Sequence, residues 1–205
     1  MADKKIITIW DEHKLLKENI NFLKTKTKTV TFPASDFIKT IVQDLIDAYQ
    51  MINCAGIAAN QIGYEYQIFI GMKELIDPED AEAIEKAEAE LSDSIGNPHG
   101  DNYEIYINPQ IDRFDKNSIN QDEEGCLSVP GLRGFVERPR SIRVDFLDEN
   151  AEPKSIEIED FLATVFQHEL DHLIGKLYID RMKDISTLMF EDEMIFEEVE
   201  EELLD

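Results

Sequence analysis

The feature that most constrains this chain is the stretch His168-Glu169-Leu170-Asp171-His172, which places two histidines four positions apart. On an α-helix, residues at this spacing lie one turn apart on the same face, so both imidazoles can reach one metal ion. The glutamate between them can then sit beside a metal-bound water. A chain with four histidines and this much glutamate produces the pattern by chance in roughly one case in a hundred. A metal site therefore needs a third ligand from elsewhere in the sequence.

The residues around this stretch predict the helix that carries it. Asp160 is suited to cap its N-terminus, and Gly175 is well placed to end it. Its packing side chains are Phe161, Leu162, Val165, Phe166 and Leu173. We therefore expect this helix to lie at the centre of the fold.

The rest of the chain alternates between strand and helix patterns, with no repeat or linker. A second helix is expected to open at 33–36, and its apolar stripe consists of Phe37, Ile38, Ile41, Val42, Leu45, Ile46 and Tyr49. Before this helix we expect a strand or extended arm at 6–10 and a polar connection through 28. After it we expect strands at 66–71 and 103–109 (the latter closed by proline), a helix at 79–91 and a loop-like region leading to 123–131. Strands at 141–147 and 155–158, joined by a turn at 148–150, and an extended piece at 175–182 complete the expected elements. This order predicts an α+β fold, with antiparallel β-sheets around a central metal-binding helix and a C-terminal helix.

Size and composition predict one domain that spans residues 1–205. Within it, residues 73–102 are interpreted as a surface insertion and residues 185–205 as an acidic C-terminal helix. Hydrophobic residues make up 42% and charged residues 32%, which is typical of a soluble globular chain. No apolar run approaches the ~20 residues of a membrane span, and the first residues lack a signal-peptide pattern. Two cysteines cannot build a disulfide framework, so we expect a cytoplasmic, reducing location and no membrane partner.

The charge balance argues against one class of function. The formal net charge is −25, from 45 acidic and 20 basic residues. A surface of this sign repels phosphate backbones, so we expect no direct nucleic-acid binding.

Several residues are candidates for the third ligand when only residue types are considered. They are Cys126, Cys54, His13, His99 and many carboxylates. His13 and His99 fit surface and loop positions. Cys126 lies in a small-residue loop just before the strands that lead to the helix, although a free cysteine is more often simply buried. Gln61, taken alone, fits a loop glutamine that bonds nearby backbone.

Three separate stretches resemble, in order, the three motifs of the peptide deformylases: 54–61 (CAGIAANQ), 124–128 (EGCLS) and 167–172 (QHELDH). The similarity extends to 107–109 and 172–180, and it covers most of residues 6–182. Three motifs in the right order are far more specific than one histidine pair. The chain is therefore identified, by resemblance, with this family.

The resemblance implies one metal ion held by Cys126, His168 and His172. Fe(II) is the usual native ion of the family, and zinc or nickel can take its place. The implied reaction removes the N-formyl group from the N-terminal formylmethionine of newly made polypeptides and releases formate. Metal-bound hydroxide attacks the formyl carbon and Glu169 shuttles the proton. The Gln61 amide and the Leu127 backbone N–H stabilise the oxyanion.

The same resemblance implies a substrate site for formylmethionyl nascent polypeptides on a protein that we expect to be a monomer. Backbone of the first motif is expected to pair with the extended peptide, and two residues of the central helix are expected to wall the methionine pocket. The full implied set is Ala55, Gly56, Ile57, Glu124, Gly125, Arg133, Phe161 and Thr164. Gln167 and Asp171 are interpreted as polar groups that steady the helix.

One departure from the family pattern leaves two rival functions open. The first motif normally begins with glycine, and here that position is Cys54, whose side chain would narrow the cleft or bring a second thiol near the metal. The first rival is a zinc peptidase with a third ligand downstream of His172. The second is a non-catalytic binding module, whose structural metal would be closed by a fourth protein ligand.

Overall fold

Antiparallel strands and two long helices make up most of the structure, a computed structural model that describes residues 5–11, 14–75 and 96–190. The elements in chain order are β1 (Trp10–Asp11), β2 (Lys14–Leu15), α1 (Lys17–Leu23), α2 (Asp36–Met51), β3 (Gly56–Ala58), the 3-10 turn η1 (Ala59–Ile62), β4 (Ile68–Met72), β5 (Tyr103–Phe114), β6 (Ile119–Cys126), β7 (Val129–Pro139), β8 (Ser141–Leu147), β9 (Pro153–Glu159), α4 (Asp160–Leu173), η2 (Tyr178–Asp180), η3 (Ile185–Thr187) and β10 (Met189–Phe190). The predicted α+β fold with antiparallel sheets is confirmed. None of the described helices has the length and apolar character needed to cross a membrane.

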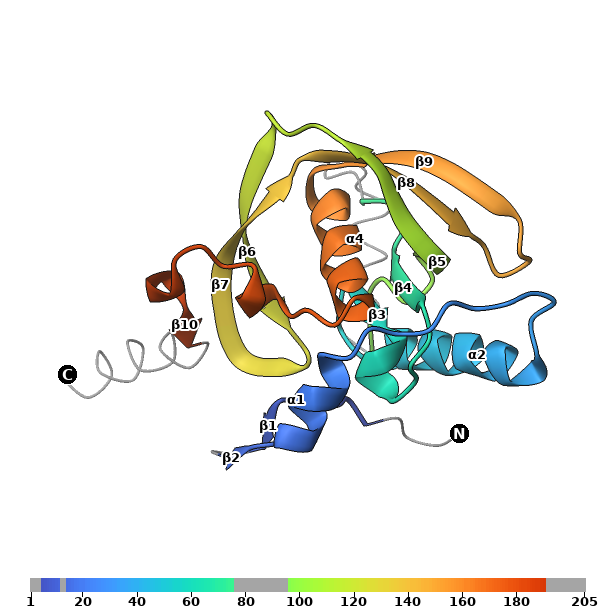
Figure 1. Cartoon of the computed structure of the whole chain (residues 1–205), viewed down its shortest axis with the longest axis horizontal. Coiled ribbons are helices and arrows are strands. Elements are labelled where there is room, and N and C mark those ends of the chain that lie inside the picture. The colour runs from blue at the N-terminus through green and yellow to red at the C-terminus, as the bar shows by residue number, and fades with distance from the viewer. Residues whose placement is uncertain (1–4, 12–13, 76–95, 191–205) are drawn as a thin grey trace.

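Two main sheets flank the helix α4 (Figure 1). The larger sheet has the strand order β3-β4-β5-β8-β9, and the smaller has the order β10-β7-β6. Neighbouring strands in both sheets are antiparallel. Strand β3 lies at an edge of the larger sheet, so one side of its backbone has no strand partner within that sheet.

Helix α4 is buried along most of its length, as its apolar residues predict. Ala163, Phe166 and Leu173 join a core cluster with side chains from the larger sheet. The Phe166 ring meets Phe69 and Tyr106 edge to face, with centroids 5.1 and 5.2 Å apart. These contacts hold the helix against the larger sheet, and its other sides carry the polar residues described below.

Helix α2 begins where the sequence predicts. Ser35 is its N-terminal cap, and the Ser35 side chain accepts a hydrogen bond from the Ile38 N–H. Most of the apolar stripe packs into the core, where Leu45 and Tyr49 are fully buried. Phe37 is an exception, because it is 51% exposed and lies at the surface against the rings of two tyrosines.

The hairpin of β6 and β7 is the largest element that the sequence prediction missed. The loop-like region expected after 109 instead contains the end of β5 and all of β6. Strand β5 continues past Pro109, and its register against β8 shifts between Ile107 and Gln110. A proline has no N–H to donate to a neighbouring strand, and such an irregularity can accommodate it. Strand β6 is rich in Asn, Gln, Asp and Glu, a composition that indicates a loop.

Three other expectations need correction. The polar connection through residue 28 contains helix α1, whose Leu23 is fully buried. The extended piece at 175–182 contains the 3-10 turn η2. Residues 185–190 form η3 and β10 rather than the start of a helix, because the backbone of β10 pairs with β7.

Two predictions fall partly outside the described residues. The helix expected at 79–91 and residues 191–205 of the acidic tail both lie there. Of the insertion, the structure describes residues 73–75 and 96–102, and residues 96–102 consist of turns and bends. The latter segment contacts the rest of the protein through Asn97, whose side-chain N–H groups donate to the carbonyl of Cys54 at 3.0 Å.

Candidate metal centre and active site

Helix α4 presents His168 and His172 toward the smaller sheet. Their ring centroids are 5.1 Å apart, as expected for residues one helical turn apart. Gly175 follows the helix with a φ of 76°, a conformation that glycine adopts without strain. A Cβ at this position would lie only 2.4 Å from the Lys24 carbonyl oxygen, so the chain can leave the helix here only with glycine.

The predicted N-terminal cap of this helix, Asp160, is corrected by one residue. Helix α4 begins at Asp160, with Glu159 at the cap position and no side-chain hydrogen bond from it. The Asp160 carboxylate instead accepts from Arg140 Nε and Nη2, at 2.6 and 3.2 Å. Because Arg140 engages this carboxylate, the first N–H groups of the helix receive no cap from it.

Cys126 completes a three-residue cluster with the two histidines. It ends strand β6, where the register against β7 shifts between Gly125 and Cys126. Its Sγ lies 3.2 Å from His172 Nε2, and one ligand atom from each of the three residues falls within 4.8 Å of the others. Among the described residues this is the one group of three or more His, Cys, Asp or Glu side chains close enough to hold a metal ion. Cys54 is not part of it.

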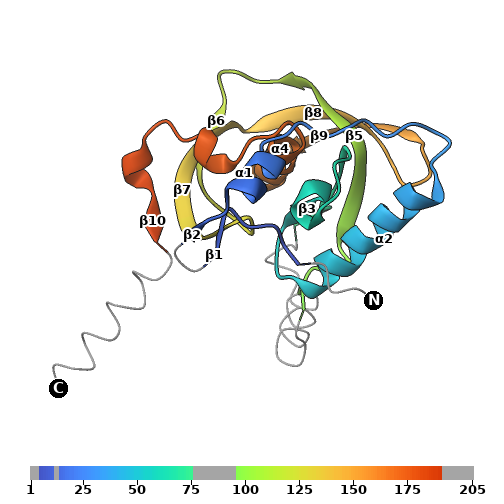
Figure 2. The same cartoon turned by 60° about the horizontal axis from the view of Figure 1, so that its bottom comes forward.

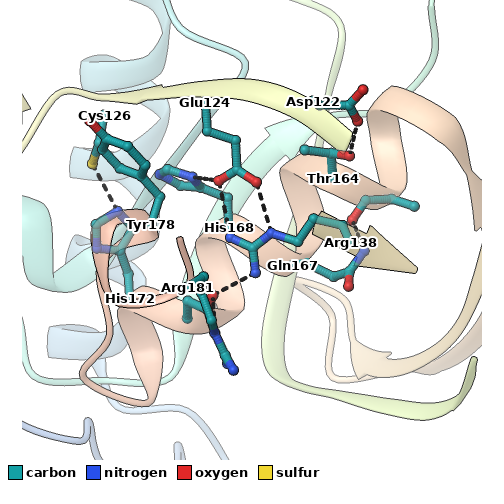
Figure 3. A network of polar contacts seen from close by, with 12 residues as sticks. Asp122, Glu124, Cys126, Arg138, Thr164, Gln167, His168, His172, Tyr178 and Arg181 are labelled. Atoms are coloured by element: carbon teal, nitrogen blue, oxygen red, sulfur yellow. Dashed lines mark hydrogen bonds and ion pairs between the residues drawn. The ribbon is translucent and has the colours of Figure 1, made fainter. Parts of the chain in front are cut away.

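A buried carboxylate fixes the orientation of His168. Glu124 Oε2 lies 2.8 Å from His168 Nδ1, and Arg138 donates to both oxygens of Glu124 at 2.8 and 3.0 Å (Figure 3). Burial disfavours the charged form of Glu124, but the hydrogen bonds from His168 and Arg138 outweigh it and lower the pKa to about 2. The ionised carboxylate therefore accepts from Nδ1–H and leaves Nε2 of His168 available for a metal.

The residues of the cluster fit a metal cation. Burial lowers the pKa of His172 well below its usual range, which keeps this imidazole neutral, as a ligand must be. Burial also disfavours charge on His168, yet Cys126 and Glu124 raise its pKa well above the usual value. The surroundings of His168 thus stabilise positive charge. A thiol with two imidazoles is a donor set that suits Fe(II), Zn or Ni.

The network extends from Glu124 along the helix to Asp171. Arg138 Nη1 donates to Asp171 Oδ2 at 2.6 Å, and Arg181 Nε donates to the same oxygen at 2.9 Å (Figure 3). Gln167 Nε2 donates to the carbonyls of Pro139 and Ala163, at 3.0 and 2.9 Å. Strand β7 is thereby joined to helix α4 on either side of His168.

Glu169 faces away from this network. It is buried, and its Oε2 has no hydrogen-bond partner among the described residues. Burial raises its pKa to about 7. Gly56 lies against it, and a Cβ there would come within 2.8 Å of Glu169 Cγ and Oε1, so this backbone must be glycine for the glutamate to keep its position.

Gln61 and Leu127 lie on either side of Cys126. Gln61 is 2% exposed, and its Oε1 accepts from the Ala58 N–H at 2.8 Å. Its Nε2 is then directed toward Ser128 Oγ, at 3.2 Å, and Cys126 Sγ, at 3.7 Å. Leu127 lines the same cleft. The structure thus gathers the predicted oxyanion donors beside the three predicted ligands.

A cleft of about 550 Å³ opens onto the cluster. The predicted substrate residues that line it are Ala55, Gly56, Glu124, Gly125, Arg133, Phe161 and Thr164. Thr164 also donates to Asp122 Oδ2 at 2.8 Å, and Arg133 lies at the rim in an ion pair with Glu123. Ile57 does not line the cleft with its side chain, which is fully buried in the core cluster beneath α2, so only its backbone in edge strand β3 remains a candidate for contact with a peptide.

Cys54 lines the cleft without joining the metal cluster. Burial, with the nearby Glu169 as the next cause, raises the pKa of its thiol to about 12. A protonated thiol is a poor metal ligand. The described residues therefore do not support the rival reading of a structural metal closed by Cys54, and they place no ligand cluster downstream of His172 for a zinc peptidase.

Some residues of the site were missed by the sequence prediction. Arg138 is the most important, and Asn60 is another, because its Nδ2 donates to the His172 carbonyl at 2.8 Å. A signal for Arg138 existed in strand β7, where Leu132, Val136 and Arg138 alternate inward with exposed residues. An arginine in register with core residues indicates a buried partner.

Fold and site together define a class of protein. It is an α+β chain in which two sheets hold a helix between them, and a cleft ends at a cysteine–histidine–histidine cluster. A buried glutamate, whose Oε2 has no hydrogen-bond partner in the described part of the chain, lies beside that cluster. Residues of these types in this arrangement are typical of a mononuclear metallohydrolase site.

Comparisons with known proteins identify the family within this class. The model of the family described as Polypeptide deformylase matches residues 12–187. Peptide deformylase 2 of Clostridium perfringens (strain 13 / Type A) is 32% identical over 191 residues, which are 92% of this chain and 99% of that protein. Peptide deformylase 2 of Vibrio cholerae is 36% identical over 168 residues, covering 82% of this chain and 84% of that protein. The crystal structure of a probable peptide deformylase from Synechococcus phage S-SSM7 is similar with a TM-score of 0.66 and 26% identity, covering 88% of this chain and all of that one.

The chain therefore belongs to the polypeptide deformylase family, and the predicted family is confirmed. It is an enzyme, since its curated relatives and structural neighbours are peptide deformylases. The family removes the N-formyl group from nascent polypeptides.

Proposed function

We propose that this enzyme is a metal-dependent peptide deformylase, which hydrolyses the N-formyl group of formylmethionyl nascent polypeptides and releases formate. The main observation in support of this proposal is that Cys126, His168 and His172 place their ligand atoms within 4.8 Å of one another at the end of a cleft. These three residues would hold one divalent ion, with Fe(II) as the native metal and Zn or Ni as substitutes. When bound, the ion supplies a Lewis acid that acidifies a water molecule and polarises the formyl oxygen.

Glu169 is proposed as the proton carrier of the reaction. Its Oε2 has no partner among the described residues, and its pKa of about 7 lies near neutral pH. A carboxylate of that basicity can take a proton from the attacking water and later give it to the departing amine. Gly56 supports this role, because it lets the peptide backbone approach the glutamate closely.

Gln61 and Leu127 are proposed as the donors for the developing oxyanion. The Ala58 N–H holds the carbonyl end of the Gln61 side chain, so its NH₂ group faces the metal cluster before substrate arrives. A donor that is already oriented stabilises the charge without a cost of reorganisation. The Leu127 N–H is the second donor.

The substrate peptide is proposed to pair with the backbone around Ala55 and Gly56. Strand β3 lies at the sheet edge, and both residues line the cleft, which supports the addition of an extended peptide there. Phe161 and Thr164 wall the methionine pocket, and Arg133 at the rim orients the rest of the peptide. Cys54 narrows the entrance as a neutral thiol.

The test is formate release from a formyl-methionyl peptide by anaerobically purified protein reconstituted with Fe(II), Ni(II) or Zn(II). The acetyl-methionyl peptide serves as a control for amide hydrolysis without a formyl group. We expect formate with each metal and the highest rate with Fe(II). If no metal gives release above buffer, the proposed function is wrong.

A further inference from the structure

Residues 5–9, here called the N-terminal arm, lead into β1 close to helix α1 (Figure 2). The Ile7 N–H donates to the Gln61 carbonyl at 2.8 Å, and the Ile9 N–H donates to the Ser128 carbonyl at 2.9 Å. Gln61 belongs to the turn η1 between β3 and β4 of the larger sheet, whereas Ser128 lies between β6 and β7 of the smaller sheet. The arm therefore links the two halves of the site by two backbone hydrogen bonds.

The arm is itself held from the side of α1. The Leu16 N–H donates to the Ile9 carbonyl at 2.8 Å, and Asn19 Nδ2 donates to the Thr8 carbonyl at 2.9 Å. Ile9 is buried in a cluster that includes Val129 of β7. The arm precedes residues 12–187, which match the family model, so the family match assigns it no role.

We propose that the N-terminal arm is a positioning segment that fixes the position of the Gln61 amide relative to the Leu127 N–H. This inference rests on the proposed function, in which these two groups stabilise one oxyanion. The Gln61 side chain reaches the turn between β6 and β7 through contacts of its Nε2 with Ser128 Oγ at 3.2 Å and Cys126 Sγ at 3.7 Å. Asn60 ties η1 to α4 rather than to that turn. The arm binds both the Gln61 and the Ser128 carbonyls and thereby supplies a backbone link that fixes η1 against the turn.

The arm acts through Gln61 and Ser128 and does not line the cleft. A misplacement of about 1 Å at a catalytic group can reduce the rate as much as a hundredfold. Loss of the Ile7 hydrogen bond shifts η1 without removing any ligand or donor. We therefore expect kcat to fall about tenfold, with KM and bound metal unchanged.

The test is Ile7→Pro, which removes this N–H, compared with Lys5→Pro as a matched control. Lys5 is exposed, and its N–H has no partner among the described residues, so the control places proline in the same arm without breaking an anchor. Formate release is measured per bound metal. The emission of Trp10, the single tryptophan, reports separately whether the arm stays docked. We expect a red shift and a fall in kcat for Ile7→Pro, and wild-type values for Lys5→Pro.

A double-mutant cycle distinguishes positioning from general destabilisation. If the arm acts through Gln61, then Ile7→Pro added to Gln61→Ala changes kcat by less than about twofold. An equal fall in both backgrounds, or an unchanged kcat for Ile7→Pro, overturns the inference. An inactive wild-type enzyme overturns the proposed function instead. If Ile7→Pro does not fold, replacement of Ile7 by its α-hydroxy acid removes the same N–H and keeps the side chain, and the same criteria apply.

Discussion

Two buried glutamates, Glu124 and Glu169, lie on opposite sides of His168, and their surroundings differ in the hydrogen-bond partners that they offer. We call these two sides of helix α4 its flanks. On the side of the smaller sheet, Glu124 is surrounded by Arg138 and His168, and its pKa falls to about 2. On the cleft side, Glu169 is equally buried, but its Oε2 has no partner among the described residues and its pKa rises to about 7. Burial disfavours the charge of both residues; at Glu124 the hydrogen bonds from His168 and Arg138 outweigh it, whereas at Glu169 burial prevails.

This difference separates two tasks that a carboxylate can perform. A carboxylate with a pKa of about 2 stays ionised at neutral pH and can fix the orientation of a ligand, but it cannot carry a proton. A carboxylate with a pKa near 7 exchanges its proton readily, and an arginine hydrogen-bonded to it, as Arg138 is to Glu124, would remove that ability. We infer that the flank of Glu124 orients the metal ligands, whereas the flank of Glu169 performs the chemistry.

The largest expected effect comes from Glu169→Gln. The amide keeps the shape of the side chain but cannot take the proton of the attacking water, so kcat should fall by roughly 10²–10⁴-fold. Bound metal, measured by elemental analysis, should remain at the wild-type level, since Glu169 is not in the ligand cluster. Glu159→Gln, at the exposed end of β9, is the control. Retained turnover in Glu169→Gln would assign the proton transfer to another group.

On the other flank, Arg138→Met tests the buried ion network. The change leaves two carboxylates, Glu124 and Asp171, without their shared partner in a buried site. We expect the free energy of unfolding to fall by about 3–5 kcal/mol and metal affinity to fall about 10–100-fold. Urea denaturation and metal titration measure these quantities.

Arg140→Met is the matched control for that change. Arg140 lies two residues away and forms an exposed ion pair with Asp160. Exposed pairs contribute little, so its stability and metal affinity should stay close to those of the wild type. Equal losses in the two variants would mean that the Arg138 network has no special part in holding His168.

The third prediction returns to the cleft flank and concerns Gly56→Ala. The new Cβ would lie 2.8 Å from Glu169 Cγ and Oε1, so the glutamate must shift. A displacement of that kind should lower kcat by about tenfold or more. Gly71→Ala is the control, because Gly71 pairs with Gly56 in the same sheet but offers a Cβ a contact no closer than 3.6 Å. Similar kcat values in both variants would show that Glu169 is not confined by Gly56.

The two flanks also differ in how far the sequence predicted them. The cluster of Cys126 with His168 and His172 depends on helical spacing and on a motif, and both are local properties that a sequence displays. The buried ion network around Glu124 depends on Arg138, which reaches Glu124 and Asp171 only because β6 and β7 pair. That hairpin is polar, and the pattern indicated a loop instead.

The direction of each side chain around the cleft is a further property that the motif does not give. Ile57 belongs to the same motif as Gly56, yet successive side chains of a strand point to opposite faces, so Ile57 enters the core beneath α2. A motif match gives the residues but not the side to which each one faces. The tail is a second case in which contacts distant in sequence decide the structure, because the backbone pairing of β10 with β7 overrides a helical pattern at 185–190.

The smallest expected effect concerns Cys54, a titratable group that lines the cleft near Glu169. Its thiol has a pKa raised to about 12, first by burial and then by Glu169, so it stays protonated well above neutral pH. Its ionised fraction grows only as the pH approaches 12, so Cys54→Ala should leave the shape of the kcat/KM profile unchanged between about pH 6 and 9. Parallel profiles would leave Glu169 as the cleft group that titrates near neutral pH. A basic limb that moves in Cys54→Ala would show that the thiol ionises in this range and shares the charge of the site with Glu169.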